Sequence, residues 1–560
     1  MIPRRLFGKL DDWLNPIVVK ELRQAVRSRV VVVALMLFLL LQIALFGLHV
    51  LQIETAHSQN EEIFSAGRQV FRILQGALLG TCLLVPIYAG LRLGAERSDT
   101  NVDLLFISTL RPRAIVSGKL LAALVLVLLI FSACTPFMTF SYLLRGLDMP
   151  TIGLVLYIDF LVTLGAIQVA LFLAVIPAPL AVRGVFILAG LGGLIYLFTG
   201  TLEWTGALIQ SGLGTFPEPW MFWLPLLAET LVELGLAGLL FVWSVAILSP
   251  PSANRALPVR LYLLFFWLVT MCVAGYWSQK LNQLDRPEPG LNPYHPIGWW
   301  VVFSGVLFSL QLVLSINERE HWGPRVARSI PRRAWLRMPA FLLYSGSAGG
   351  VLFSLLILLL TFWGGILVLE HFGDNREGGE SLVESLKLVM LVGLYTYCYC
   401  LSAVLIRAAL MRNHLRPLGT WVLAVMLTGL GSILPYLLAY FFYPEALRYS
   451  AREQELWRAT NPFASIDEAM LYHRTTSYPR LSGAGFREHS RFWARDIFDA
   501  PCLPFLAGWA AVVTLLGSLW VAGQAGRFQP LDRREEPVEV LPDAEEEAIA
   551  PSVTDVSKIS

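Results

Sequence analysis

The chain has 560 residues, of which 56% are hydrophobic and only 15% are charged, and its net charge is +2. A soluble protein of this length would form several domains, each with a polar surface, and typically about 25% of its residues would be charged. The composition therefore excludes an ordinary soluble enzyme, a disordered chain and a nucleic-acid-binding protein. It predicts an all-α fold, that of a polytopic helical membrane protein.

Twelve apolar stretches are long enough to cross a bilayer, because a spanning helix needs about 20 mostly apolar residues. The first, 30–53, carries no charged residue and is too long for the apolar core of a signal peptide. The others are 70–91, 119–143, 152–176, 184–200, 221–248, 261–277, 297–315, 339–369, 382–406, 418–443 and 503–524. Two of them are irregular: 184–200 is short, and 221–248 is long and broken by Pro225.

The distribution of basic residues predicts the orientation. With a cytoplasmic N-terminus, twenty-four lysines and arginines fall on inner short segments and only five on outer short loops. Short cytoplasmic loops are enriched in Lys and Arg, so we expect both termini in the cytoplasm. The basic stretch that contains arginines 325–337 has three interpretations: a surface for anionic lipid, a surface for an acidic partner, or an ordinary basic inner loop.

The spans divide into two six-span membrane domains, 30–248 and 249–524, preceded by the segment 1–29. The long segment 444–502 is expected to form an outer subdomain. Residues 525–560 are rich in Glu and poor in apolar residues, which predicts a disordered acidic cytoplasmic tail. The second half repeats the outline of the first, with Glu318-Arg319 where the first half has Glu96-Arg97. Two arrangements fit this outline: a fused pseudo-dimer, or a six-span core with an accessory half that forms homodimers.

A short basic helix is predicted before the first span. Asn15 is a good N-cap and Pro16 suits the first helical position. One face of this helix is apolar and the other is basic, so we expect it to lie in the inner headgroup region. The apolar face contains Val18, Leu22, Ala25 and Val26, and the polar face contains Lys20, Arg23, Gln24 and Arg27. The alternative is an ordinary basic flank of the first span.

A second helix is predicted in the inner loop 92–118, where Ser98 or Thr100 can cap it and Pro112 ends it. Its apolar face, with Leu105 and Phe106, would be exposed to the cytoplasm. Such a helix is typical of a docking element, although a solvated loop has the same composition.

Both segments resemble the ABC-2-type permeases, the membrane subunits of ABC exporters. The first motif comprises Asn15, Pro16, Lys20, Glu21, Leu22 and Arg23, and the second comprises Glu96, Arg97, Leu104, Leu105, Arg111, Gly118 and Lys119. The candidate coupling residues are Glu96, Arg97, Thr100, Asp103, Leu104, Leu105, Phe106 and Arg111. The resemblance is strongest over residues 1–150. It implies that the first segment is an interfacial connecting helix and the second a coupling helix that binds a separate ATP-binding subunit, in two copies. Asn461-Pro462-Phe463-Ala464 resembles a pattern found before the last outer hairpin of that family. Family members have six spans per subunit, whereas this chain has about twelve.

The chain has no P-loop of its own. Gly-Lys occurs only at Gly8-Lys9 and Gly118-Lys119, each followed by Leu and without a glycine in register. We therefore expect a non-enzymatic chain that binds no cofactor or metal, with ATP and magnesium on the partner subunit.

Three acidic residues fall inside spans, where an ionisable group is a candidate for function. Asp159, Glu229 and Glu233 are candidates for a translocation path. Aromatic residues around Pro225 offer an alternative, in which that segment is an interfacial belt or re-entrant turn and Glu229 lies near the outer headgroups.

The resemblance implies a permease for ATP-driven export in a bacterial cytoplasmic membrane, with the substrate left open. Two alternatives remain at this point: a secondary, proton-coupled transporter that uses the three acids, and a non-transporting membrane scaffold.

Overall fold

The computed structural model describes most of the chain as helices. The described residues are 16–55, 62–98, 111–144, 147–176, 180–212, 219–250, 252–283, 294–318, 322–371, 376–410, 417–442, 459–467, 497–498, 500 and 502–530. In these ranges no residue is assigned to a β-strand. The expectation of an all-α fold is confirmed.

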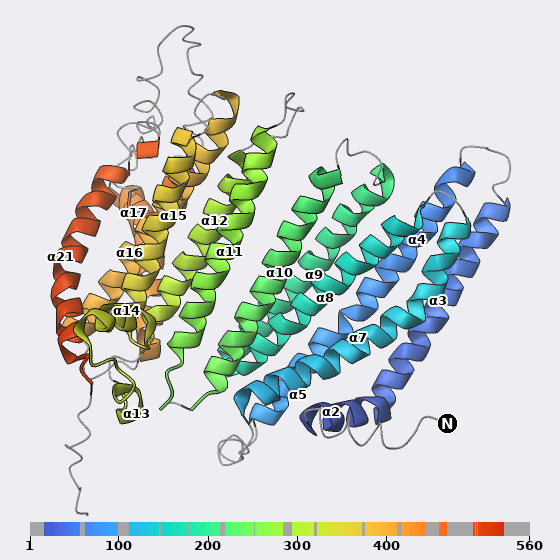
Figure 1. The fold of residues 1–560 in the computed structure, drawn as a ribbon, viewed down its shortest axis with the longest axis horizontal. Helices are drawn as coiled ribbons and strands as arrows, with labels where there is room; N and C mark the ends of the chain where they lie inside the picture. The colour runs from blue at the N-terminus through green and yellow to red at the C-terminus, as the bar shows by residue number, and fades with distance from the viewer. Residues whose placement is uncertain are drawn as a thin grey trace, which may run out of the picture.

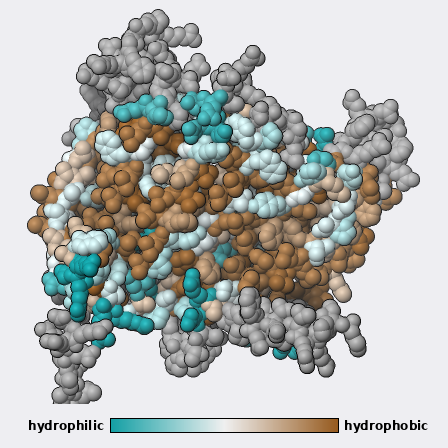
Figure 2. Space-filling view, viewed as in Figure 1, coloured by the Kyte–Doolittle hydropathy of each residue, from teal (hydrophilic) through white to brown (hydrophobic). Residues whose placement is uncertain are grey.

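Twelve helical segments are long and apolar enough to cross a membrane, in agreement with the twelve predicted stretches. They alternate in direction (Figure 1), and apolar residues form a band across the molecule between two more polar edges (Figure 2). The spans are α3 (Arg29–Thr55), α4 with α5 (Glu62–Cys82 and Leu84–Ser98), α7 (Pro112–Leu143), α8 (Met149–Val175), α9 (Leu180–Ser211), α10 (Pro219–Leu248), α11 (Ala256–Asn282), α12 (Tyr294–Ser315), α15 (Ser347–His371), α16 (Arg376–Leu410), α17 (Pro417–Phe442) and α21 (Leu503–Arg527). The chain is an integral membrane protein.

Three short helices are not spans. They are α2 (Pro16–Arg27), α13 (Pro324–Ala327) and α14 (Ala334–Leu343), and all three lie at the lower end of the molecule in Figure 1. We call this end of the bundle the α2 end and the opposite end the far end. The predicted coupling helix falls on residues 99–110, which lie outside the described residues.

Several predicted boundaries were wrong. The stretch 184–200 belongs to the full-length helix α9, and α10 runs unbroken through Pro225, so it contains no re-entrant turn. A proline near the start of a helix removes only one backbone hydrogen bond, which a long apolar helix tolerates. The span predicted from 339 begins at Ser347, because α14 ends at Leu343. Residues 525–528, predicted to belong to a disordered tail, are ordered, since α21 continues to Arg527 and Phe528 is buried; residues 531–560 lie outside the described residues.

The spans form two bundles that lie side by side (Figure 1), with α3–α10 in one and α11–α21 in the other. The order of neighbours is largely the same in both. In each bundle the second span packs against the first, third and fourth, the fourth packs against the third, fifth and sixth, and the third also contacts the sixth. The two halves therefore share a packing scheme.

The bundles meet where α10 packs against α11. Two glycines on one face of α10 permit this approach, since a Cβ at Gly235 would overlap the ring of Phe266 and one at Gly238 would overlap the hydroxyl of Tyr262. The Tyr262 hydroxyl donates a 3.0 Å hydrogen bond to the carbonyl of Gly235. Small residues allow helices to approach closely in a membrane.

Candidate functional site at the α2 end

Helix α2 packs against α7 and α3 of the first bundle. Val18 is buried, as the amphipathic pattern predicts, and Lys20 and Arg23 are exposed. Glu21, three residues after Val18, shares the inward face and is only 7% exposed. A charged residue on that face was not anticipated from the pattern of apolar residues.

The Glu21 carboxylate joins two spans. One oxygen accepts a hydrogen bond from Lys119 Nζ on α7 at 3.1 Å, and the other lies 3.3 Å from Arg92 Nε on α5. Lys119 is also buried, at 6% exposed. Arg92 donates in addition to the Tyr88 hydroxyl at 2.7 Å and to Gln24 Oε1 on α2. We call Glu21, Arg92 and Lys119 the α2 clasp.

The α2 clasp connects three pieces of chain that are far apart in sequence. Arg92 lies near the end of the second span and Lys119 near the start of the third, so Glu21 contacts both spans close to these ends. Removing one partner of a buried ion pair leaves an uncompensated charge, which makes such a junction costly to open. The clasp therefore links α2, α5 and α7 at this end of the first bundle.

The other residues of the two motifs are placed only in part. Pro16 begins α2, Leu22 is partly buried, and Glu96 and Arg97 lie in the last turn of α5. Arg111 is exposed immediately before Pro112, which opens α7. Asn15, Thr100, Asp103, Leu104, Leu105 and Phe106 lie outside the described residues.

The second bundle has an ion pair at the corresponding place. Arg260, fully buried near the start of α11, donates to both carboxylate oxygens of Glu318 at 2.6 Å. Glu318 follows the end of α12, and its carboxylate also accepts from the backbone N–H of Gly346 at 2.7 Å, just before α15. This arrangement joins the first span, the end of the second and the start of the third, whereas the α2 clasp joins the helix before the first span to the second and third spans. The outline of the sequence placed Glu318 opposite Glu96 of the first half. In the structure, Glu318 instead resembles Glu21, because each is the carboxylate of an ion pair that connects helices at this end of its bundle.

Inside the first bundle, Asp159 lies in a polar cluster that is completely buried. The Gln75 amide on α4 donates to the two Asp159 oxygens at 3.0 and 3.1 Å and to the Thr205 hydroxyl on α9 at 2.9 Å. Among the described residues, no Lys or Arg pairs with Asp159. A buried carboxyl held by neutral donors is suited to binding a proton or a polar group.

The other two candidate acids are not part of this cluster. Glu233 lies against α8 at Gly165, where a Cβ would be 3.2 Å from the Glu233 Oε1 atom. Gly165 is six residues after Asp159, which places it about 120° away around the helix. Glu229 is exposed on the surface of the bundle. The three acids predicted to form one path therefore occupy at least two separate environments.

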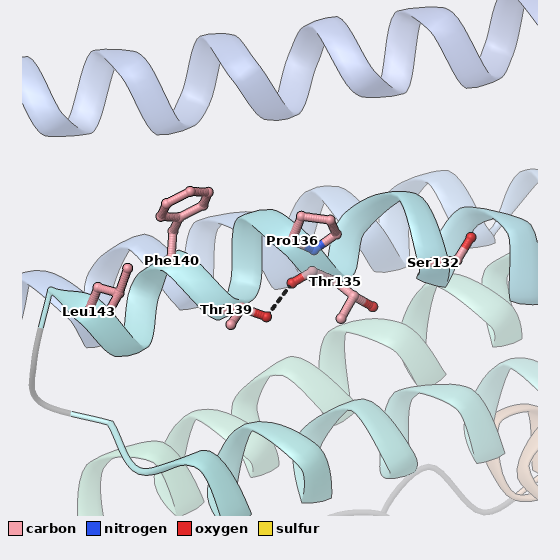
Figure 3. A pocket seen from close by; sticks show the side chains of 6 residues that line it. All are labelled: Ser132, Thr135, Pro136, Thr139, Phe140 and Leu143. Carbon is pink, nitrogen blue, oxygen red and sulfur yellow. Dashed lines mark hydrogen bonds between the residues drawn. The ribbon is translucent and has the colours of Figure 1, made fainter.

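A hollow of about 670 Å³ follows the outward face of α7 toward the far end. All six residues that line it come from this helix, so it is a groove along one helix face (Figure 3). Its hydroxyl groups are satisfied locally: Thr139 donates to the carbonyl of Thr135 at 2.8 Å, and Ser132 donates to that of Leu129 at 2.9 Å. None of the three candidate acids lines it. The groove is lined by Ser132, Thr135, Pro136, Thr139, Phe140 and Leu143.

The motif at Asn461 is built into the second bundle. Pro435 has no N–H, so the Gly431 carbonyl in α17 lacks its helical donor. The Thr460 hydroxyl supplies one at 3.1 Å, and Asn461 Nδ2 donates to the next carbonyl, of Ser432, at 3.1 Å. Asn461 Oδ1 also accepts from the N–H groups of Phe463 and Ala464 and so caps the helical turn 462–467. Part of the predicted outer subdomain thus packs within the bundle; most of 444–502 lies outside the described residues.

Comparison with known proteins finds no matching family model, and no curated protein or solved structure that is similar to the chain.

Proposed function

We propose that the chain is the permease subunit of an ABC-2-type transporter, which forms the pathway for ATP-driven export together with a separate ATP-binding subunit. The observation that carries the proposal is the α2 clasp. Glu21 belongs to the first motif of the resemblance and Lys119 to the end of the second, and these two residues form a buried ion pair. The two motifs are thus parts of one junction.

The junction is suited to transmitting force. A partner bound to the loop 92–118 would pull on the ends of α5 and α7, and Glu21 would carry that movement to α2 and from there to α3. In this proposal the α2 end faces the cytoplasm of a bacterial cell, both termini lie on that side, and ATP and magnesium bind to the partner. The coupling contacts are assigned to Leu105 and Phe106.

The similarity of the two bundles determines how many ATP-binding subunits we propose for each permease chain. Because both bundles share a packing scheme and each has an ion pair between elements at the same end, one chain would supply both halves of the pathway as a fused pseudo-dimer. Each half would engage one ATP-binding subunit, giving two copies per chain. A six-span core that dimerises would instead give two permease chains per complex, which native mass spectrometry distinguishes.

Co-purification tests the coupling. An ATP-binding chain should be recovered with the wild-type permease and lost with Leu105→Asp/Phe106→Asp, because two charges on an apolar docking face oppose burial. The matched control, Gly323→Asp/Ala334→Asp, places the same charges outside the spans, at exposed positions where α13 and α14 begin, and should retain the partner. If no ATP-binding chain accompanies the wild-type protein under any nucleotide condition, the proposal is wrong.

A proton-coupled carrier is the second candidate, and Asp159 is the observation that favours it. Its carboxyl is fully buried in a cluster of neutral side chains that connects α8 with α4 and α9, as expected for a group that exchanges a proton. Transport by the purified chain in liposomes, driven by a pH gradient and without ATP, would support this candidate over the first.

A further inference from the structure

The segment between α12 and α15 combines dense positive charge with exposed apolar side chains. From Trp322 to Ser345 it contains five arginines and no acidic residue. Four of these side chains are exposed: Arg325, Arg328, Arg332 and Arg333. The surface they form faces outward at the α2 end of the second bundle.

Helix α14 lies within this segment and has two unlike faces. Ala340 and Phe341 are buried against the bundle, whereas Trp335 is 69% exposed and Met338 is 72% exposed. The helix ends at Leu343, only four residues before the span α15 begins at Ser347. Figure 1 shows it lying across the ends of the spans rather than along them. Its exposed residues are therefore at the level where a membrane meets water.

Hydrogen bonds and ring contacts connect this segment to itself and to the end of the last span. Arg337 donates to the carbonyls of Pro331 and Arg332, at 3.3 and 2.9 Å, and the Tyr344 hydroxyl donates to the carbonyl of Ser329 at 2.9 Å. Phe528, which follows the last span, packs its ring against Trp322, Phe341 and Tyr344. We call residues 322–345 the α14 platform. Because its backbone is fixed in this way, its arginines are presented as a preformed surface.

We propose that the α14 platform binds the headgroups of anionic phospholipids, with Trp335 and Met338 inserted at the boundary between headgroups and acyl chains. Guanidinium groups pair with phosphate through parallel hydrogen bonds, and a cluster of basic residues beside a span attracts anionic lipid. Tryptophan is enriched at membrane interfaces, where one part of the ring is apolar and the other polar. The exposed Trp335 and Met338 favour lipid over a soluble partner, because they are large apolar side chains on a helix that ends four residues before a span. The inference does not depend on the proposed coupling to an ATP-binding subunit.

Native mass spectrometry of the purified chain tests the charge. We expect phosphatidylglycerol to bind in preference to phosphatidylcholine, and the Arg325→Gln/Arg333→Gln variant to bind it at least about tenfold more weakly. The matched control, Arg113→Gln/Lys280→Gln, removes the same charge at sites away from the platform. It should bind phosphatidylglycerol as tightly as the wild type does. Equal loss in both variants would show that only net charge matters and would overturn the proposal.

Fluorescence quenching tests the insertion. The difference between the wild type and Trp335→Phe isolates one of the 17 tryptophans. In vesicles of phosphatidylglycerol brominated near the headgroup end of the acyl chains, this difference signal should be quenched by the lipid and protected from iodide. Quenching by iodide alone would place Trp335 in water and exclude insertion. If Arg325→Gln/Arg333→Gln instead releases an ATP-binding chain while lipid binding is unchanged, the platform is a protein-docking surface and the proposal is wrong.

Discussion

Glu21 and Lys119 are 98 residues apart in the chain, yet their side chains form a buried ion pair of 3.1 Å. The pair joins the helix that precedes the first span to the start of the third. Arg92, which is more exposed, completes the α2 clasp at the end of the second span. Because the three side chains differ in burial and in number of partners, substitutions at each should lower the stability of the protein by different amounts.

Glu21→Gln should destabilise the protein more than Lys119→Met. The first change removes the buried carboxylate that both Lys119 and Arg92 contact, which costs about 3–5 kcal/mol. The second leaves Glu21 paired with Arg92, so we expect a loss of about 1–3 kcal/mol. Unfolding in mixed micelles with increasing denaturing detergent measures both. Equal losses would contradict the assignment of Glu21 as the centre of the clasp.

Gly235→Ala and Gly238→Ala should weaken the contact between the two bundles. Each added methyl group would overlap an aromatic side chain of α11, and overpacking of this kind typically costs about 1–3 kcal/mol. Gly275→Ala on α11 is the control, because no atom lies within 4 Å of its Cβ position. The thermal midpoint of unfolding in detergent should fall for the first two variants only. A fall for Gly275→Ala of the same size would point to a general effect of the substitution.

Thr460→Val should destabilise the second bundle by about 1–3 kcal/mol, because it removes the donor to the Gly431 carbonyl. Pro435→Ala restores the N–H that would satisfy this carbonyl within α17. In the Pro435→Ala background, Thr460→Val should therefore cost less than in the wild type. A double-mutant cycle measures the difference, and strictly additive effects would show that the two groups do not share the carbonyl.

Gln75→Leu should cost about 1–3 kcal/mol, since the buried Asp159 carboxyl loses its donor. Asp159→Asn should be better tolerated, because the amide oxygen can still accept from Gln75. Unfolding in detergent compares the two variants. A larger loss for Asp159→Asn than for Gln75→Leu would mean that the negative charge itself stabilises the bundle.

Asp159→Asn also separates the two candidate functions. A proton-coupled carrier should lose gradient-driven uptake in this variant, because the amide cannot exchange a proton at this site. An ATP-driven permease should retain nucleotide-dependent transport. Uptake into liposomes, with and without a reconstituted ATP-binding chain, measures both.

Local pattern was sufficient for the membrane class and for the existence of all twelve spans, since apolar length alone decides whether a helix can cross a bilayer. It also placed the start of α2 at Pro16. Boundaries were less reliable where packing decided them: α14 and α15 appeared as one stretch, and Phe528 was assigned to a disordered tail although tertiary contacts bury it.

The site was predictable only in part. The sequence by itself identified Glu21, Lys119 and Asp159 as notable, because their motifs and their charge within or beside spans are visible in one dimension. Only the tertiary structure paired Glu21 with Lys119 and separated Asp159 from Glu233. Which helices become neighbours depends on close packing and on the pairing of buried charges. These are properties of contacts between distant residues, and a linear pattern does not contain them.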